Sequence, residues 1–215
     1  MKNLLIKEIR LASHVLSYLF IAFAFMTLIP GYPILVGSFF VCLGIFQSFQ
    51  SSRESNDVLY TVLLPIEKGD AVRARFLFVC FIQLLALLIM GALTAVRMVL
   101  WADAAPYANN AMMNANLAYL GYAAVVFALF NGVFVGPFFR TAYKFGRPFV
   151  TFIVLSFLVI IVGETLHHIP GLEFLNGTGR LGIQGAILGA GLLIYALVTA
   201  LSCRRACRVF ETVDL

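Results

Sequence analysis

Charged side chains are the scarcest feature of this 215-residue sequence. Asp, Glu, Lys and Arg make up 12% of the chain, about half of their usual one-quarter share in soluble domains. Apolar residues make up 62%, and the mean hydropathy is +0.98. A soluble core cannot enclose that much apolar surface, so the composition excludes an ordinary soluble domain and indicates an integral membrane protein.

Charge is absent altogether from six long segments. A membrane-spanning α-helix needs about 20 mostly apolar residues, each adding about 1.5 Å. The runs that approach this length without Asp, Glu, Lys or Arg are 14–29, 34–50, 76–96, 117–139, 149–163 and 183–202. We therefore predict an all-α membrane protein with six transmembrane helices. The fifth run is short, and a partly re-entrant segment is an open alternative there.

Basic residues lie mostly on one side of these predicted spans. With the N-terminus inside, thirteen of the fifteen Lys and Arg residues fall in cytoplasmic segments, and only Arg97 and Arg180 fall outside. Such a bias marks the side that stays in the cytoplasm during insertion. Five spans would move a basic cluster to the outer face, so we predict six spans with both termini cytoplasmic. The net charge of +5 then reflects contacts with anionic lipid rather than with nucleic acid.

Motifs of catalysis and metal binding are also missing. The sequence has no G-x-x-x-x-G-K-[ST] phosphate loop and no H-E-x-x-H, and Cys203 and Cys207 stand among arginines. The spans hold no ionisable residue at mid-membrane, which argues against a proton-coupled carrier. We interpret His167 and His168 as polar residues of an outer loop. We predict no catalytic residue, no metal site and no cofactor bound by this chain.

The chain divides into an N-terminal segment, 1–13, and a transmembrane region, 14–215. In the N-terminal segment Leu5, Ile9 and Ala12 share one helical face. This pattern favours an amphipathic helix lying on the inner leaflet over a charged extension of the first span.

The cytoplasmic segment 51–75 differs from the other connections. It carries four basic and four acidic residues around an apolar stretch. Ser55 or Asn56 can cap a short helix that Pro65 ends, and Asp70 is predicted to cap the next helix. An apolar helix held on the cytoplasmic face must rest either on the bilayer or on a partner protein.

At this segment the sequence resembles the membrane subunit of an ABC-2 type transporter, in particular the small six-span bacterial permeases encoded apart from their ATPase. The matching positions are Glu54, Asp57, Leu59-Tyr60, Leu64-Pro65-Ile66, Lys68, Asp70, Val72, Arg73 and Arg75. The resemblance implies an exporter in the bacterial inner membrane. It also implies a cytoplasmic ATP-binding subunit that carries ATP and Mg²⁺, and a second permease subunit in a homodimer or heterodimer.

The same resemblance implies that segment 51–75 is a coupling helix seated on the ATPase. The implied contact residues are Glu54, Asp57, Leu59, Leu64, Pro65 and Lys68. A rival prediction is an assembly or sensory protein whose loop docks another protein without moving a substrate. A membrane-embedded enzyme is a weaker alternative because no acid–base or metal set is present.

Uncharged polar residues inside the spans need hydrogen-bond partners in lipid. Packing between helices is the commoner explanation, and a translocation path is the functional one. The candidate path residues are Gln47, Gln50, Gln83 and Asn131. Gly185 and Gly189 form a small-residue ridge suited to close contact with another helix, such as one of a second subunit. The aliphatic and aromatic spans suit an amphipathic or apolar cargo such as a peptide, a lipid or a drug.

Overall fold

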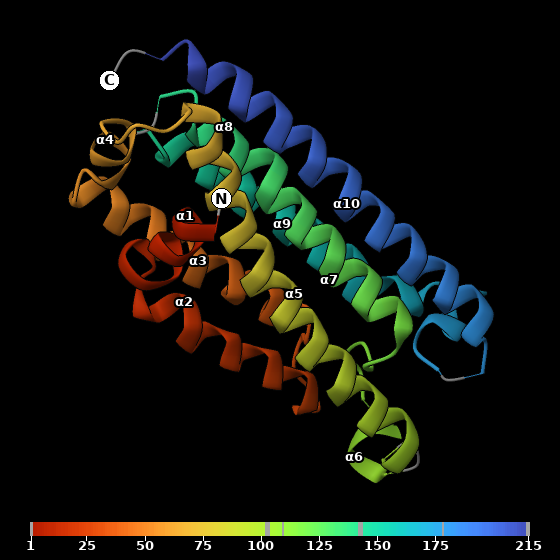
Figure 1. Ribbon diagram of the computed structural model, residues 1–215. Helices are drawn as coiled ribbons and strands as arrows, with labels where there is room; N and C mark the ends of the chain where they lie inside the picture. Colours follow the sequence, from red (N-terminus) through yellow and green to blue (C-terminus); the bar gives the residue numbers. More distant parts are fainter. Residues whose placement is uncertain (1, 102–103, 109, 142–143, 178, 214–215) are drawn as a thin grey trace.

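The computed structural model describes residues 2–101, 104–108, 110–141, 144–177 and 179–213, and these residues form helices and loops without a strand. The long helices run side by side as a bundle (Figure 1). Helices α2, α5, α7 and α10 lie next to one another in one layer, and α3 and α9 lie behind them. The fold is therefore all-α, as the sequence predicts.

The N-terminal segment turns sharply before the first long helix. Its elements are α1 (Lys2–Lys7), the π-helical η1 (Glu8–Ala12), α2 (Val15–Leu19) and the 3₁₀-helical η2 (Phe20–Leu28). The first pair and the second pair meet at 96°. Backbone at Ser13 and His14 is extended, and the His14 ring accepts the N–H of Leu16 to cap α2. Whether the first pair lies in the membrane interface stays a prediction.

Helix α3 (Val36–Glu54) lies in the core of the bundle. A Cβ at Gly37 would stand 2.7 Å from the Phe23 carbonyl oxygen, and one at Gly44 would stand 2.9 Å from that of Leu16. Glycine at these two positions lets α3 approach the second helical pair, α2 and η2, closely. Close approach also lets Ser17 donate to the Gly44 carbonyl at 2.7 Å.

Two helices follow α3 on the same end of the bundle. The short α4 spans Asp57–Val62, and the long α5 spans Lys68–Leu100. Asn56 precedes α4 in the left-handed conformation (φ 52°), which Asn tolerates, but its side chain makes no capping bond. The prediction that Asp70 caps the next helix is wrong: α5 begins two residues earlier, and Asp70 instead pairs with Arg73 at 2.8 Å.

The next helical run changes its geometry near Pro137. After α6 (Ala105–Ala108), it consists of α7 (Leu117–Leu129), the π-helical η3 (Phe130–Val135) and α8 (Gly136–Phe138). Proline has no N–H and crowds the carbonyl one turn back, so the preceding turn widens. The Gly136 N–H then bonds to the Asn131 carbonyl, five residues earlier.

The last two long helices are α9 and α10. They span Gly146–Thr165 and Leu181–Glu211, with the short 3₁₀ turns η4 (Leu166–His168) and η5 (Glu173–Leu175) between them. Helix α10 packs mainly on α7, where Gly191 meets Gly121 backbone to backbone. At Gly182, Gly185 and Gly189 an added Cβ would meet nothing within 4 Å, so this part of the ridge faces away from the described chain.

Four helices of the described residues are long and apolar enough to cross a membrane: Lys68–Leu100, Leu117–Phe138, Gly146–His168 and Leu181–Glu211. The bent N-terminal pair would make a fifth span. Helix α3, which covers the predicted run 34–50, falls short because its second half carries Gln, Ser, Arg and Glu. The protein is thus a multi-pass membrane protein with four to five spans on length and composition.

The end of the bundle opposite α4 is closed by hydrogen bonds between its loops. The buried Glu164 carboxylate accepts the backbone N–H groups of Leu35 and Met113, each at 3.0 Å. Arg97 donates to the Thr27 carbonyl at 2.7 Å and to Asn114 at 2.9 Å. These bonds use N–H and C=O groups that the helix ends and loops leave free.

Candidate functional site

Helix α4 carries an apolar surface that no described residue covers. It lies at the end of the bundle that also holds α1, α8 and the C-terminal end of α10 (Figure 1). Val58 and Thr61 face inward and are buried, whereas Tyr60 is 65% exposed, Leu63 73% and Leu64 48%. Tyr60 lies on α4, and Leu63 and Leu64 follow its last residue, Val62. Exposed apolar residues gathered on this short helix and the turn after it mark an interaction surface. We call Tyr60, Leu63 and Leu64 the α4 surface.

A cluster of four charged side chains holds α4 against the bundle. Lys7 lies 2.6 Å from Asp57 and 3.1 Å from Glu8, and it donates to the Thr61 hydroxyl at 2.7 Å. Arg75 lies 2.8 Å from Glu8 and 2.9 Å from Asp57. Two cations and two anions balance, so the cluster is neutral. We call Lys7, Glu8, Asp57 and Arg75 the charged junction.

The charged junction is largely buried, so its ion pairs matter for the stability of the fold. Glu8 and Arg75 are each 3% exposed, and the Arg75 guanidinium also bonds to Ser52 at 2.7 Å and lies over the Phe49 ring. Removing one partner of such a buried pair leaves an uncompensated charge. The junction therefore ties η1, α4 and α5 together as one unit.

The predicted contact residues around α4 differ in exposure and in the contacts that they make. Glu54 ends α3 and is exposed, Leu59 is half-buried, and Pro65 is exposed after the helix. Lys68 begins α5 and donates to the Val213 carbonyl at 2.8 Å, so it also holds the C-terminal end of the chain. Asp57 is engaged in the charged junction. Their contact with an ATPase stays a prediction.

Sequence reasoning missed part of this site. Tyr60 and Leu63 are more exposed than Leu59 and Leu64, and their spacing, together with the inward Val58, already gives α4 an outer face. No signal in the sequence pairs Glu8 with Arg75, because 67 positions separate them and only the fold brings them together.

Two of the four candidate path residues meet in the middle of the bundle. Gln83 and Asn131 exchange hydrogen bonds of 3.0 and 2.9 Å and are fully buried. Asn131 also donates to Thr199 at 2.8 Å, and Tyr195 donates to Gln83 at 3.1 Å. This polar cluster links α5, η3 and α10, and within the single chain it serves helix packing.

The other two candidates, Gln47 and Gln50, are half-buried on α3 near its α4 end. Gln50 points toward Glu54, with 3.4 Å between the amide nitrogen and the carboxylate. The structure brings these two glutamines close to the start of segment 51–75 and not to Gln83 and Asn131. In the described residues no group of three or more His, Cys, Asp and Glu side chains gathers as a metal site.

Comparisons with known proteins place this architecture in a family. No curated protein and no solved structure matches the chain. A family model described as "ABC-2 family transporter protein" matches residues 3–211, which includes most of the N-terminal segment, the charged junction and every long helix. The chain therefore belongs to the ABC-2 transporter family, whose members are the membrane permease components of ABC transporters.

Proposed function

We propose that this permease exports its cargo using a separate ATP-binding subunit that docks on the α4 surface. The observation that carries the proposal is an exposed apolar helix held rigidly to a membrane span. The apolar side chains suit a cleft on a partner protein, and exposed Glu54 beside them offers a rim charge. Glu54, Leu59, Leu64, Pro65 and Lys68 surround this contact.

The charged junction gives the docked ATPase a route to the membrane. Movement of α4 is passed through Asp57 and Arg75 to α5, whose 33 residues extend about 50 Å at 1.5 Å each. Lys7 and Glu8 carry the same movement to the N-terminal segment. Closure of the nucleotide domains would thus tilt helices as rigid bodies.

ATP and Mg²⁺ belong on the partner in this proposal. The chain has no phosphate-binding loop, and its cytoplasmic segments are too short for a nucleotide-binding domain. The permease contributes the membrane path and the docking surface rather than the hydrolysis.

We propose the six-span arrangement with both termini cytoplasmic. The first span is short as an α-helix, but nine of its residues are 3₁₀-helical, and the longer rise per residue brings α2 and η2 to about 25 Å together. Helix α3 crosses beside it, shielded from lipid by its neighbours, so its polar residues need not face the bilayer. The α4 end is then the inner face of a bacterial cytoplasmic membrane.

A second permease subunit, the same chain or a related one, completes the transporter. The open stretch of α10 around Gly185 and Gly189 supports this part of the proposal, since small residues let another helix approach closely in lipid. The path for an amphipathic or apolar peptide, lipid or drug would begin at Gln47 and Gln50. It would pass the Gln83–Asn131 pair when the bundle opens.

Co-purification tests the docking proposal. The tagged permease, expressed with its candidate ATP-binding subunit, is extracted in mild detergent and compared with the variant Tyr60→Gln/Leu63→Gln. We expect the wild-type chain to retain the ATPase and the variant to retain at least tenfold less of it. The control Ile169→Gln changes an apolar residue of similar exposure at the opposite end. If the wild type retains no ATPase, the assembly or sensory alternative is favoured instead.

A further inference from the structure

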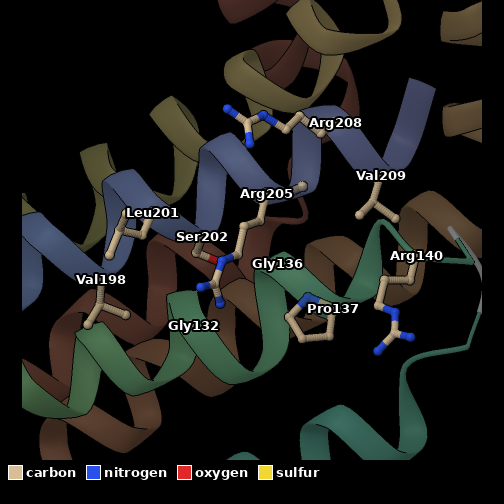
Figure 2. Close-up of a pocket in the computed structure, with 11 residues that line it drawn as sticks. Gly132, Gly136, Pro137, Arg140, Val198, Leu201, Ser202, Arg205, Arg208 and Val209 are labelled. Carbon is tan, nitrogen blue, oxygen red and sulfur yellow. The ribbon is translucent and has the colours of Figure 1, made fainter. Parts of the chain in front are cut away.

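A groove of about 550 Å³ lies between the η3–α8 turn and the C-terminal half of α10. Figure 2 shows Gly132, Gly136 and Pro137 on one wall and Val198, Ser202 and Val209 on the other. The elements that line it, α8 and the C-terminal half of α10, lie at the α4 end of the bundle (Figure 1).

Small residues and the widened turn at Pro137 shape this groove. A Cβ at Gly132 would stand 2.8 Å from Val198, and one at Gly136 would overlap the Ser202 hydroxyl. Ser202 donates to the Asn131 carbonyl at 2.8 Å, so its polar atom is already satisfied. What the groove offers an occupant is therefore an apolar floor without free hydrogen-bonding groups.

Two arginines flank the apolar floor. In Figure 2, Arg205 extends from α10 over the Gly132–Gly136 wall, and Arg140 extends beside Val209 from the end of α8. Both are exposed, and neither makes an ion pair or a side-chain hydrogen bond within the described parts of the chain. Arg208 also borders the groove, but its guanidinium points to the other side of α10.

We propose that this groove binds one anionic phospholipid, with the phosphate headgroup between Arg140 and Arg205 and an acyl chain along Val198 and Leu201. A soluble anion would gain nothing from the apolar floor, and an apolar peptide would gain nothing from two unpaired cations. An anionic lipid uses both features of the groove, because its phosphate can pair with the arginines and its acyl chain can pack on the apolar floor. Leu201, 52% exposed and one turn below Arg205, extends the apolar surface toward the membrane. The proposal does not depend on transport or on an ATPase.

A second copy of the chain is the competing occupant. The part of α10 best suited to such contact is the open ridge at Gly185 and Gly189, near the opposite end of the helix. The groove begins about two turns beyond Gly191 and carries like charges that two copies would bring together. Charge complementarity thus favours lipid.

Fluorescence quenching by brominated lipid tests the proposal. Trp101, the only tryptophan, is replaced by Phe, and Val209→Trp places a reporter in the groove. The purified full chain is reconstituted in phosphatidylcholine vesicles containing increasing fractions of brominated phosphatidylglycerol or of brominated phosphatidylcholine. We expect preferential quenching by the anionic lipid at low fractions, weakened by salt and not competed by inorganic phosphate.

Variants in the same reporter background identify the arginines responsible. Each of Arg140→Gln and Arg205→Gln should lower the preference for the anionic lipid about fivefold, and the double variant should abolish it. Arg204→Gln, an exposed neighbour that does not line the groove, is the matched control and should leave it unchanged. Equal quenching by both lipids would overturn the proposal. A reporter that neither lipid quenches would also overturn it, because the groove would then be covered by protein.

Discussion

The two ends of the bundle are built in opposite ways. At the α4 end, the ion pairs of the charged junction lie beneath an apolar helix whose outer side chains are uncovered. At the other end, Glu164 and Arg97 bind backbone groups of neighbouring loops, and their bonds close the bundle upon itself. Charge is used at both ends: at the α4 end it lies beneath exposed apolar side chains, and at the other end it ties loops to helix ends.

We infer that a partner protein acts at the α4 end. A closed end with its backbone groups satisfied has little to offer a docking protein. At the α4 end, the short helix is joined by ion pairs to the 33-residue helix α5. Substitutions at either end of the bundle test this difference, and their expected effects on the free energy of unfolding differ in size.

The largest effect is expected from Arg75→Ala. Removing this guanidinium leaves the buried Glu8 carboxylate without its closest cation, and we expect the free energy of unfolding to fall by about 3–5 kcal/mol. SDS-induced unfolding of the purified protein in mixed micelles measures it. Arg73→Ala, which breaks an exposed pair on the same helix, should cost less than about 1 kcal/mol. Equal losses in the two variants would show that the junction does not hold α4.

A smaller effect is expected at the opposite end from Glu164→Ala. The N–H groups of Leu35 and Met113 lose their acceptor, and we expect a loss of about 2–3 kcal/mol in the same unfolding experiment. ATPase retention per folded permease should stay at the wild-type value. Glu173→Ala, at an exposed outer position, provides the control. Loss of ATPase binding in Glu164→Ala would contradict the division of roles between the ends.

The smallest effect on stability is expected from Leu63→Gln. The side chain is 73% exposed, so the free energy of unfolding should change by less than about 0.5 kcal/mol. The same variant should still weaken ATPase association, as a hot-spot residue does. A folded variant with undiminished association would remove Leu63 from the docking surface.

Local patterns predicted much of this architecture. Charge-free runs located the long helices, and mixed charge around an apolar stretch located α4, because both signals lie within a few turns of sequence. The predicted run 34–50 became a core helix in which Ser38 and Ser48 are buried and Gln47 and Gln50 are half-buried. Hydropathy alone does not separate a shielded helix from one that faces lipid.

Other features depend on long-range packing and were not predictable. Glu8 lies in the charged N-terminal segment 1–13, where the sequence predicts an amphipathic helix on the inner leaflet, yet its side chain is buried against Arg75. Asp70 looked like a cap, but α5 starts at Lys68, where the chain leaves the turn at Pro65. Gln83 and Asn131 are 48 positions apart, and only the packing of α5 against η3 brings their side chains together.

Photo-crosslinking in cells tests the central contrast most directly. A photoreactive phenylalanine analogue at Leu63 is compared with one at Ile169, each in the otherwise unchanged chain co-expressed with the ATP-binding subunit. Our account predicts a permease–ATPase adduct from position 63 and none from position 169. No adduct at 63, or an equal adduct at 169, would contradict the assignment of the α4 surface as the site where the ATPase docks.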